Sequence, residues 1–551
     1  MNAGNPPAVT GGDPAAMAVL MARLAGVADE MSAVLRRAAY SPNIKERADC
    51  SAAVFTPGGE LLAQAENIPV HLGSMPASVR AVIEAAGGSG EAATAPPLAG
   101  EHWIVNDPFA GGTHLNDITV VTPCVVAGGV VGWVANRAHH ADVGGAAPGS
   151  LPADAAEVFA EGLRLPPVRL TPEVRAVVLG NSRTPAERAG DLDAQVGANV
   201  RGVARLAAVV EALGGDATTH LGAVLDYGER RMRAVLAGLP DGTWAVEDRL
   251  DSAGASPDQQ HPVVIRMALT ISGDAITFDF AGSDPQTAGN VNAPASVTFS
   301  SVVYALRAAL DPGLPANGGC FRPVRVDAPA GSVVAALAPA AVGAGNVEVS
   351  QRVADVCLAA LANVAPQRVG AASQGTMNNV LLGGVRAAGP DDGAGDGAAW
   401  VYYETIGGGQ GGRPGAAGMS GIHTVMTNTR NTPVEALERA YPLRVRRYAL
   451  RRDSGGAGAH PGGDGIERDL EVLADATLSL ITERRVTPPW GLAGGSPGSV
   501  GENVLLRGGD EAAAEPLGDK CTVELRAGDV LRLRTPGGGG WGRGPGGEPG
   551  A

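Results

Sequence analysis

The sequence has little basic charge, and lysine is almost absent. Lys45 and Lys520 are the only lysines among 551 residues, and neither stands in the GxxxxGK[ST] pattern of a Walker-type phosphate loop. The formal net charge is -15 at pH 7. Such a chain repels nucleic-acid phosphates and anionic membrane surfaces. We therefore expect neither a nucleic-acid binder nor a membrane-bound protein, and any nucleotide chemistry must come from a partner or from an unrelated kind of site.

Cysteine is scarce and scattered. The five cysteines form no CxxC pair, so neither a disulfide framework nor a cysteine zinc site is indicated. The N-terminal residues lack the basic and apolar regions of a signal peptide, and we expect a cytoplasmic protein. Apolar residues make up 45% of the chain, which is typical of a folded protein with two or more domains or one large layered domain.

The densest group of chemically active residues lies between residues 101 and 145. Four of the nine histidines stand here, on either side of an apolar run from 118 to 135. The run is rich in β-branched residues and is interrupted by Gly128-Gly129, which predicts a β-hairpin. Its length is near the lower limit for a transmembrane helix, but its glycines and Pro123 favour a buried hairpin.

The predicted pairing brings histidine and aspartate together at the open end of this hairpin. A turn centred near Gly128 places Asp117 opposite His139, with Cβ atoms about 5 Å apart. His114 lies in a Gly-rich bend that can curl back to the same point. Two imidazoles and one carboxylate are a suitable ligand set for Zn, Mn, Fe or Co. A slip of one residue would exchange His139 and His140, and capping or surface roles are the alternative interpretation.

A second hairpin is predicted around residues 57–59, with polar side chains at both of its ends. These side chains are Lys45, Glu46, Arg47, Asp49, Glu66, Asn67 and His71. Asp49 is a candidate for a fourth metal ligand, although spacing alone does not show this. The alternative is an ion-pair cluster at the surface.

Helices are predicted in the first half of the chain and mostly strands after residue 242. Helical periodicity covers residues 14–40, 76–86, 154–162, 183–213, 217–238, 297–309 and 348–364. In the 154–162 helix, Glu157 and Glu161 are expected to share a solvated face. Because the predicted strands come mostly as hairpins, we expect an α+β (mixed α/β) fold with several largely antiparallel sheets and flanking helices.

The change of pattern near residue 240 predicts a subdomain boundary. The expected segments are a disordered leader at 1–12, an N-terminal subdomain at 13–240 that holds the metal site, a C-terminal subdomain at 241–540 and a flexible tail at 541–551.

Three polar, Gly-rich connections stand out, at residues 289–294, 373–379 and 402–433. Their amide and hydroxyl groups could orient a polar planar substrate or a phosphate, or could serve turns alone. No helical pattern follows GGGQGG at 407–412, so this segment is a weak match to a dinucleotide-binding fingerprint.

A series of motifs runs in order along nearly the whole chain, from about residue 15 to 543. The motifs are NIKERADCSAAVF, NIPVHLGSM, NDPFAGGTHLNDITVVTP, EGLRLPPVRL, GNVEVSQRVADV, SQGTMNN, YYETIGGGQGGRPGAAGMSGIHTVMTNTRNTPVE, PWGLAGG and TPGGGGWG. Together they resemble the hydantoinase B / 5-oxoprolinase family. The resemblance implies a subunit that works with a hydantoinase A-type partner, which uses ATP and Mg²⁺ to phosphorylate the carbonyl oxygen of the substrate. It also implies a divalent metal in this chain, at the positions that match His114, Asp117 and His139, with Asp49 as a further ligand.

Three functions are consistent with this resemblance. The first is ATP-dependent opening of a small cyclic amide, such as a hydantoin, 5-oxoproline or a lactam, by a hetero-oligomer. Asp107, His140 and Glu404 are candidates for proton transfer in that reaction. The second is the large subunit of an ATP-dependent ketone carboxylase of the acetone or acetophenone type. The third is a non-catalytic structural partner of an A-type subunit, which the intact ligand set argues against.

Overall fold

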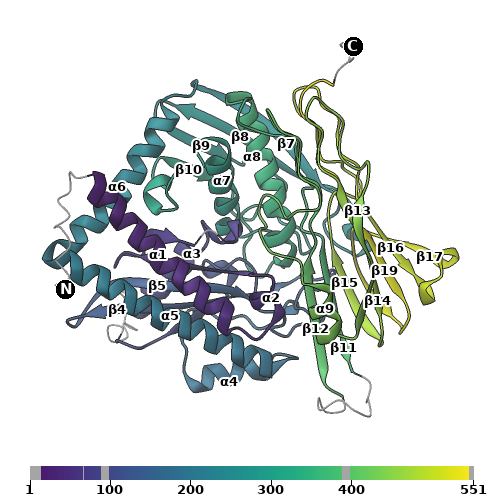
Figure 1. The fold of residues 1–551 in the computed structure, drawn as a ribbon, viewed down its shortest axis with the longest axis horizontal. Helices are drawn as coiled ribbons and strands as arrows, with labels where there is room; N and C mark the ends of the chain where they lie inside the picture. Colours follow the sequence, from purple (N-terminus) through teal and green to yellow (C-terminus); the bar gives the residue numbers. More distant parts are fainter. Residues whose placement is uncertain (1–13, 66, 88–97, 387–396, 545–551) are drawn as a thin grey trace, which may run out of the picture.

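The structure is a computed structural model that describes residues 14–65, 67–87, 98–386 and 397–544. The predicted leader and most of the predicted tail lie outside these residues. The described residues form four sheets with helices packed against them (Figure 1). Nearly all strand pairs are antiparallel, and the exception among the described strands is β9 with β10. The predicted mixed fold with several antiparallel sheets is therefore confirmed.

The first sheet contains both predicted hairpins. It has six strands in the order β2-β1-β5-β4-β3-β6. The strands are β1 (Cys50–Phe55), β2 (Leu61–Gln64), β3 (Trp103–Val105), β4 (Asp117–Val126), β5 (Gly129–His139) and β6 (Val168–Arg169). Because β1 pairs with β5 as well as with β2, the two hairpins lie side by side in one sheet.

Helices cover both faces of this sheet, which explains why its central strands are apolar on both sides. Val54 and Val134 pack in a cluster with α1 and α5, whereas Phe55 and Trp133 pack in a cluster with α3. The helices of this half are α1 (Pro14–Ala38), α2 (Pro42–Lys45), α3 (Met75–Gly87), α4 (Pro172–Gly180), α5 (Pro185–Leu213) and α6 (Ala217–Leu236). The helices predicted at 14–40, 76–86, 183–213 and 217–238 are confirmed.

The helix predicted at 154–162 is wrong. The segment contains only a short 3₁₀ turn, Val158–Ala160. Glu161 is 1% exposed instead of solvated, because its carboxylate accepts hydrogen bonds from the backbone N–H groups of Val342 and Gly343. A distant backbone segment, invisible to local periodicity, thus decides the structure here.

The second sheet follows residue 240 and has the order β10-β9-β8-β7. Its strands are β7 (Gly242–Leu250), β8 (Val263–Ser272), β9 (Ala275–Asp279) and β10 (Val324–Asp327). The helices α7 (Ala295–Ala309) and α8 (Ser350–Val364) pack against each other, and α8 packs against β7 and β8. A π-helical turn, Gly345–Val349, leads directly into α8.

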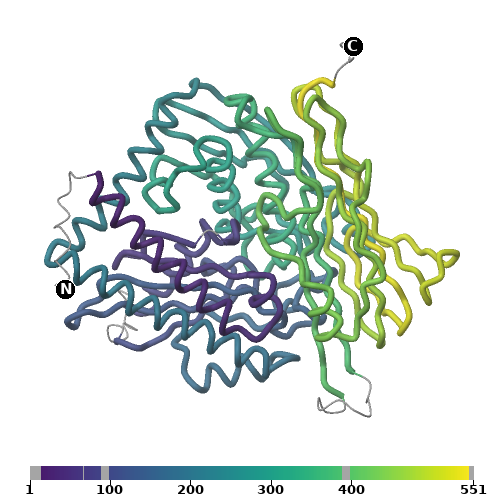
Figure 2. The backbone as a smooth tube through the Cα atoms, viewed as in Figure 1, coloured from purple at the N-terminus to yellow at the C-terminus, as the bar shows by residue number. Residues whose placement is uncertain are grey.

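The last two sheets form one side of the molecule, coloured green to yellow in Figure 2. One has the order β12-β11-β15-β18 and the other β13-β14-β19-β16-β17. Leu382, Leu478 and Leu531 belong to the hydrophobic cluster shared by the two sheets. The elements are β11 (Asn379–Val385), β12 (Ala399–Thr405), α9 (Val434–Ala440), β13 (Leu443–Arg451), β14 (Gly465–Val472), β15 (Ala476–Ile481), β16 (Glu502–Leu506), β17 (Ala514–Leu517), β18 (Lys520–Leu525) and β19 (Val530–Arg534).

The largest hydrophobic cluster joins the two halves of the chain. Phe55 and Trp133 from the first sheet belong to the same buried cluster as Phe278, Leu361 and Ile481. The division at residue 240 stays a prediction. Among the described residues, no helix combines the length and the apolar character that crossing a membrane requires.

Candidate metal centre

The hairpin β4–β5 has the predicted register. Asp117 is paired with His139, and the tight turn lies at residues 127 and 128. Opposed residues project from the same face of a sheet, so the carboxylate and the imidazole meet at the open end of the hairpin. Their exposed fractions are 1% and 2%, which makes capping and surface roles untenable for this pair.

A tightly packed loop brings His114 to the same point. A Cβ on Gly111 would lie 2.4 Å from the backbone of Ala77, and the φ of Gly111 is +87°, so the loop needs glycine here. The Gly111 carbonyl accepts a hydrogen bond from Ser78 Oγ at 2.8 Å. The loop then places His114 Nδ1 3.2 Å from Asp117 Oδ2, and the ring centroids of His114 and His139 are 5.0 Å apart.

The three side chains have buried polar atoms that no described residue satisfies. These atoms are His114 Nε2, His139 Nε2 and Asp117 Oδ1. Buried polar groups without a partner cost free energy and call for an explanation. As positioned, no group of three or more His, Cys, Asp or Glu side chains in the described part of the chain could hold a metal ion. The three atoms nevertheless fit a cation chemically, and convergence on one would require rotation of these side chains.

The electrostatics favour the protonation states that a ligand needs. Burial by itself would raise the pKa of Asp117, but His114 and His71 outweigh burial and hold that pKa well below its usual range. Burial, and then the neighbouring His114, hold the pKa of His139 well below its ordinary value. Asp117 is thus an anion and His139 a neutral imidazole near pH 7, the forms that coordinate metals.

Asp49 lies at the edge of this cluster. It precedes β1, and its backbone carbonyl accepts a hydrogen bond from the His139 N–H at 3.0 Å. Its side chain is buried, 3.8 Å from Arg47 Nη2, and burial raises its pKa. The charges of Asp117, His71 and His114 also act on that pKa, which places the Asp49 carboxylate in their neighbourhood. Its role as a fourth ligand stays a prediction.

Sequence reasoning missed several residues that support the cluster. His71 Nε2 lies 3.4 Å from Asp117 Oδ2, while His71 Nδ1 lies 3.0 Å from Ser51 Oγ. The Thr113 hydroxyl also donates to Asp117 Oδ2. The ring of Tyr403 from β12 stacks on His139, with centroids 4.3 Å apart and an interplanar angle of 8°. The polar end of the second hairpin was a signal for His71, but no spacing pattern could have indicated Tyr403.

The three candidates for proton transfer have other partners. Asp107 accepts from the Phe109 N–H and pairs with Arg164 at 2.8 Å. His140 Nε2 contacts Gln195 at 3.0 Å, on the opposite side of β5 from His139. Burial lowers the pKa of His140 to about 4.

Glu404 is part of a separate buried group. Its carboxylate contacts Tyr402 and Arg468, the latter at 2.9 Å, and accepts from the Thr432 N–H. Burial would raise the pKa of Glu404, but Arg468 lowers it overall. The partners that Glu404, Asp107 and His140 have among the described residues lie apart from the three unsatisfied atoms, and the catalytic roles of these side chains stay predictions.

Comparison with known proteins places this geometry in a family. The model of the Hydantoinase B/oxoprolinase family matches residues 13–544. An uncharacterized protein of Methanocaldococcus jannaschii is 40% identical over 94% of this chain and 88% of its own length. The 5-oxoprolinase 1 of Arabidopsis thaliana is 37% identical over 94% of this chain, but the match spans only 41% of that longer protein. The B-type subunit of a putative D-/L-hydantoinase from a Pseudomonas species is 29% identical, with 96% and 90% covered.

Two solved structures share the fold. The ATP-dependent caprolactamase from Pseudomonas jessenii superposes with a TM-score of 0.85 and 27% identity, covering 96% of this chain and 91% of that one. A nucleotide-free acetone carboxylase gives a TM-score of 0.87 over 97% of this chain and 77% of that one, and its 19% identity supports the fold alone. Because one family model spans nearly all of the chain, the protein belongs to the Hydantoinase B/oxoprolinase family.

Proposed function

We propose that this chain is the metal-containing B-type subunit of an ATP-dependent cyclic-amide hydrolase, and that it acts with an ATP-using hydantoinase A-type subunit. The observation that carries the proposal is the set of buried, unsatisfied ligand atoms on His114, Asp117 and His139. The names of relatives agree with it, since they include 5-oxoprolinases, a B-type hydantoinase subunit and an ATP-dependent caprolactamase.

The chemistry of the substrate explains why two subunits are needed. An amide resists hydrolysis because its carbonyl is a poor electrophile, and phosphorylation of the carbonyl oxygen by the A-type subunit turns that oxygen into a leaving group. Water then supplies a hydroxyl group to the carbon and a proton to the ring nitrogen as the C–N bond breaks, and ATP ends as ADP and phosphate.

The residues of this chain prepare the site for that step. A divalent cation bound by His114, Asp117 and His139 would supply Lewis-acid polarisation and lower the pKa of water. Asp117 supplies the negative charge, and the neutral His139 keeps a free lone pair at Nε2. The burial of all three side chains keeps bulk water away and strengthens electrostatic interactions within the cluster.

The test is turnover by the reconstituted pair. This chain and the A-type subunit from the same genome are purified together and assayed for ATP consumption with 5-oxoproline, hydantoins, lactams and ketones, with and without bicarbonate. We expect ring opening with stoichiometric ATP use that does not depend on bicarbonate. A product that forms only with bicarbonate would replace the proposal with a ketone carboxylase, and absence of turnover with every substrate would leave a structural subunit.

A further inference from the structure

The imidazole of His139 is held by two supports from different parts of the chain. Its Nδ1 lies 3.4 Å from Asn43 Nδ2, which leaves Nε2 for an external partner. Its ring face is covered by Tyr403, in nearly parallel stacking. Asn43 comes from α2, close to the first sheet, whereas Tyr403 belongs to β12 in the C-terminal half. The candidate metal centre is therefore completed across the junction between the two halves.

Tyr403 is itself fixed in place by a chain of hydrogen bonds. Its hydroxyl donates to Asn379 Oδ1 at 3.0 Å, and Asn379 Nδ2 donates to Glu348 Oε1 at 2.9 Å. Asn379 lies on β11 opposite Thr405, two residues from Tyr403, so the two side chains share one face of the sheet. Arg47 adds a contact from the N-terminal half, with its guanidinium carbon 4.9 Å from the Tyr403 ring centroid.

Glu348 anchors this chain of contacts in an irregular part of the backbone. It belongs to the π-helical turn before α8, a feature often found at functional sites. Its Oε1 also accepts from the Thr376 hydroxyl and the Met377 N–H, both in the Gly-rich segment 373–379. The polar groups of that segment therefore support Tyr403, instead of only closing a turn.

We propose that Tyr403 is a positioning residue for His139, and that Asn379 and Glu348 hold Tyr403 in the stacked orientation. The inference rests on the proposed metal-binding function of His139. An imidazole whose lone pair is shared with a cation becomes more positive, and the electron-rich face of tyrosine stabilises such a ring. The stacked ring also restricts the rotation of His139, so that Nε2 points in one direction.

The experiment compares two tyrosines of the same strand. Tyr403→Leu removes the aromatic face, Tyr403→Phe keeps the face and removes only the hydroxyl, and Tyr402→Leu is the matched control. Tyr402 is equally buried and points to the opposite face of the sheet, where it packs against Tyr441. The affinity for Co²⁺ is measured by titration with the full chain, together with the visible spectrum of the bound Co²⁺ and the thermal midpoint.

We expect Tyr403→Leu to weaken Co²⁺ binding about ten- to a hundredfold and to change the spectrum, as the loss of an outer support does in other metal sites. Tyr403→Phe should stay within about threefold of the wild type, because only one neutral hydrogen bond is lost. Tyr402→Leu should lower the thermal midpoint and leave affinity and spectrum unchanged. Wild-type affinity and spectrum in Tyr403→Leu, or equal losses in both leucine variants, would overturn the inference. If the wild type itself binds no Co²⁺ or other divalent metal, the proposed function fails instead.

Discussion

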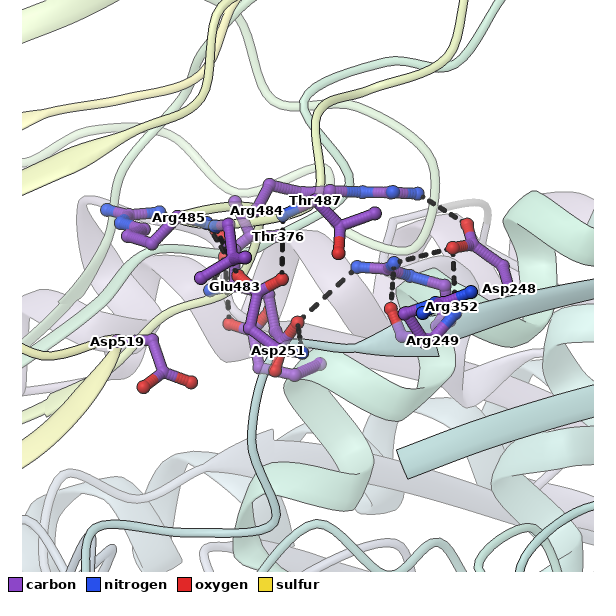
Figure 3. Close-up of polar contacts among 12 residues, drawn as sticks. Asp248, Arg249, Asp251, Arg352, Thr376, Glu483, Arg484, Arg485, Thr487 and Asp519 are labelled. Carbon is purple, nitrogen blue, oxygen red and sulfur yellow. Dashed lines mark hydrogen bonds and ion pairs between the residues drawn. The ribbon is translucent and has the colours of Figure 1, made fainter. Parts of the chain in front are cut away.

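Two buried polar regions of this protein differ in how their charges are satisfied. One is the candidate metal centre at the end of the β4–β5 hairpin. The other, here named the junction network, lies where β7 meets the C-terminal sheets and is drawn in Figure 3. It comprises Asp248, Asp251, Arg352, Asp355, Glu483, Arg484, Asp519 and Lys520. Both regions exclude water, so the difference between them lies in the partners that they provide.

In the junction network, the chain supplies its own cations. Glu483 accepts from Lys520 Nζ at 2.6 Å on one oxygen and from the Asp251 N–H at 2.8 Å on the other. Asp248 accepts from Arg352 on one oxygen and from Arg484 on the other. At the hairpin end, by contrast, Asp117 Oδ1 has no donor among the described residues. The comparison teaches that the first region is a finished structural element, whereas the second is arranged for a cation from outside.

The most direct way to break the comparison is to remove a ligand. His114→Ala should abolish metal binding at micromolar metal while the fold remains, because within the described residues the only ion pair of the His114 side chain is with Asp117. The measurement is metal content by mass spectrometry after dialysis, alongside circular dichroism. His140→Ala is the matched control, since this adjacent buried histidine faces Gln195. Full metal occupancy in His114→Ala would refute the ligand assignment.

The junction network should respond in the opposite way, with a large loss of stability and no loss of metal. Lys520→Met leaves the carboxylates of Glu483 and Asp519 buried without their cation, which should cost about 3–5 kcal/mol of unfolding free energy. The measurement is urea unfolding. Lys45→Met, at the exposed and only other lysine, should change stability by less than about 0.5 kcal/mol. Equal stability of the two variants would show that the network contributes nothing.

Glu161 is a third case, a buried carboxyl group that has neither a cation nor an open site beside it. Burial raises its pKa to about 8, despite the N–H groups of Gly343 and Val342. The native state thus holds this proton more tightly than the unfolded chain, whose pKa is near that of free glutamate. Its contribution to stability is therefore unfavourable at high pH and falls by about 1.4 kcal/mol per pH unit between the unfolded pKa and pH 8.

The comparison of Glu161→Gln with the wild type isolates this contribution. The two proteins should have similar stability near pH 4.5, and the variant should become the more stable one as the pH rises towards 8. Urea unfolding across that range gives the difference, and Glu157→Gln, at an exposed carboxylate, should show no such trend. A constant difference between wild type and Glu161→Gln would mean that Glu161 ionises normally in the native state.

Local pattern was sufficient for the hairpin and its register. Ala127 and Gly128 have φ values of 50° and 83°, as a tight hairpin turn requires, and alternation then fixes which residues oppose each other. Asp117 and His139 could therefore be paired from the sequence. The family resemblance added Asp49, which the structure places nearby through the His139 N–H.

Contacts between elements could not be predicted in this way. Tyr403 stacks on His139 because β12 packs across the end of another sheet, and no spacing in the sequence encodes that approach. Glu161 looked solvated because its partners, the N–H groups of residues 342 and 343, are far along the chain. His71 is intermediate, since its hairpin was predicted but the pairing of β1 with β5 was not.

His71 offers the smallest and most selective test of the comparison, because it acts on the site through one hydrogen bond. Ser51 Oγ can donate to His71 Nδ1, which leaves Nε2–H to donate to Asp117 Oδ2. Removal of this bond in His71→Ala should weaken metal binding about tenfold, equivalent to about 1.4 kcal/mol. His71→Gln retains an N–H donor at a similar position and should recover most of the affinity. If His71→Gln binds metal as weakly as His71→Ala, His71 is itself a ligand; if both bind like the wild type, the orientation of Asp117 is set by Thr113 alone.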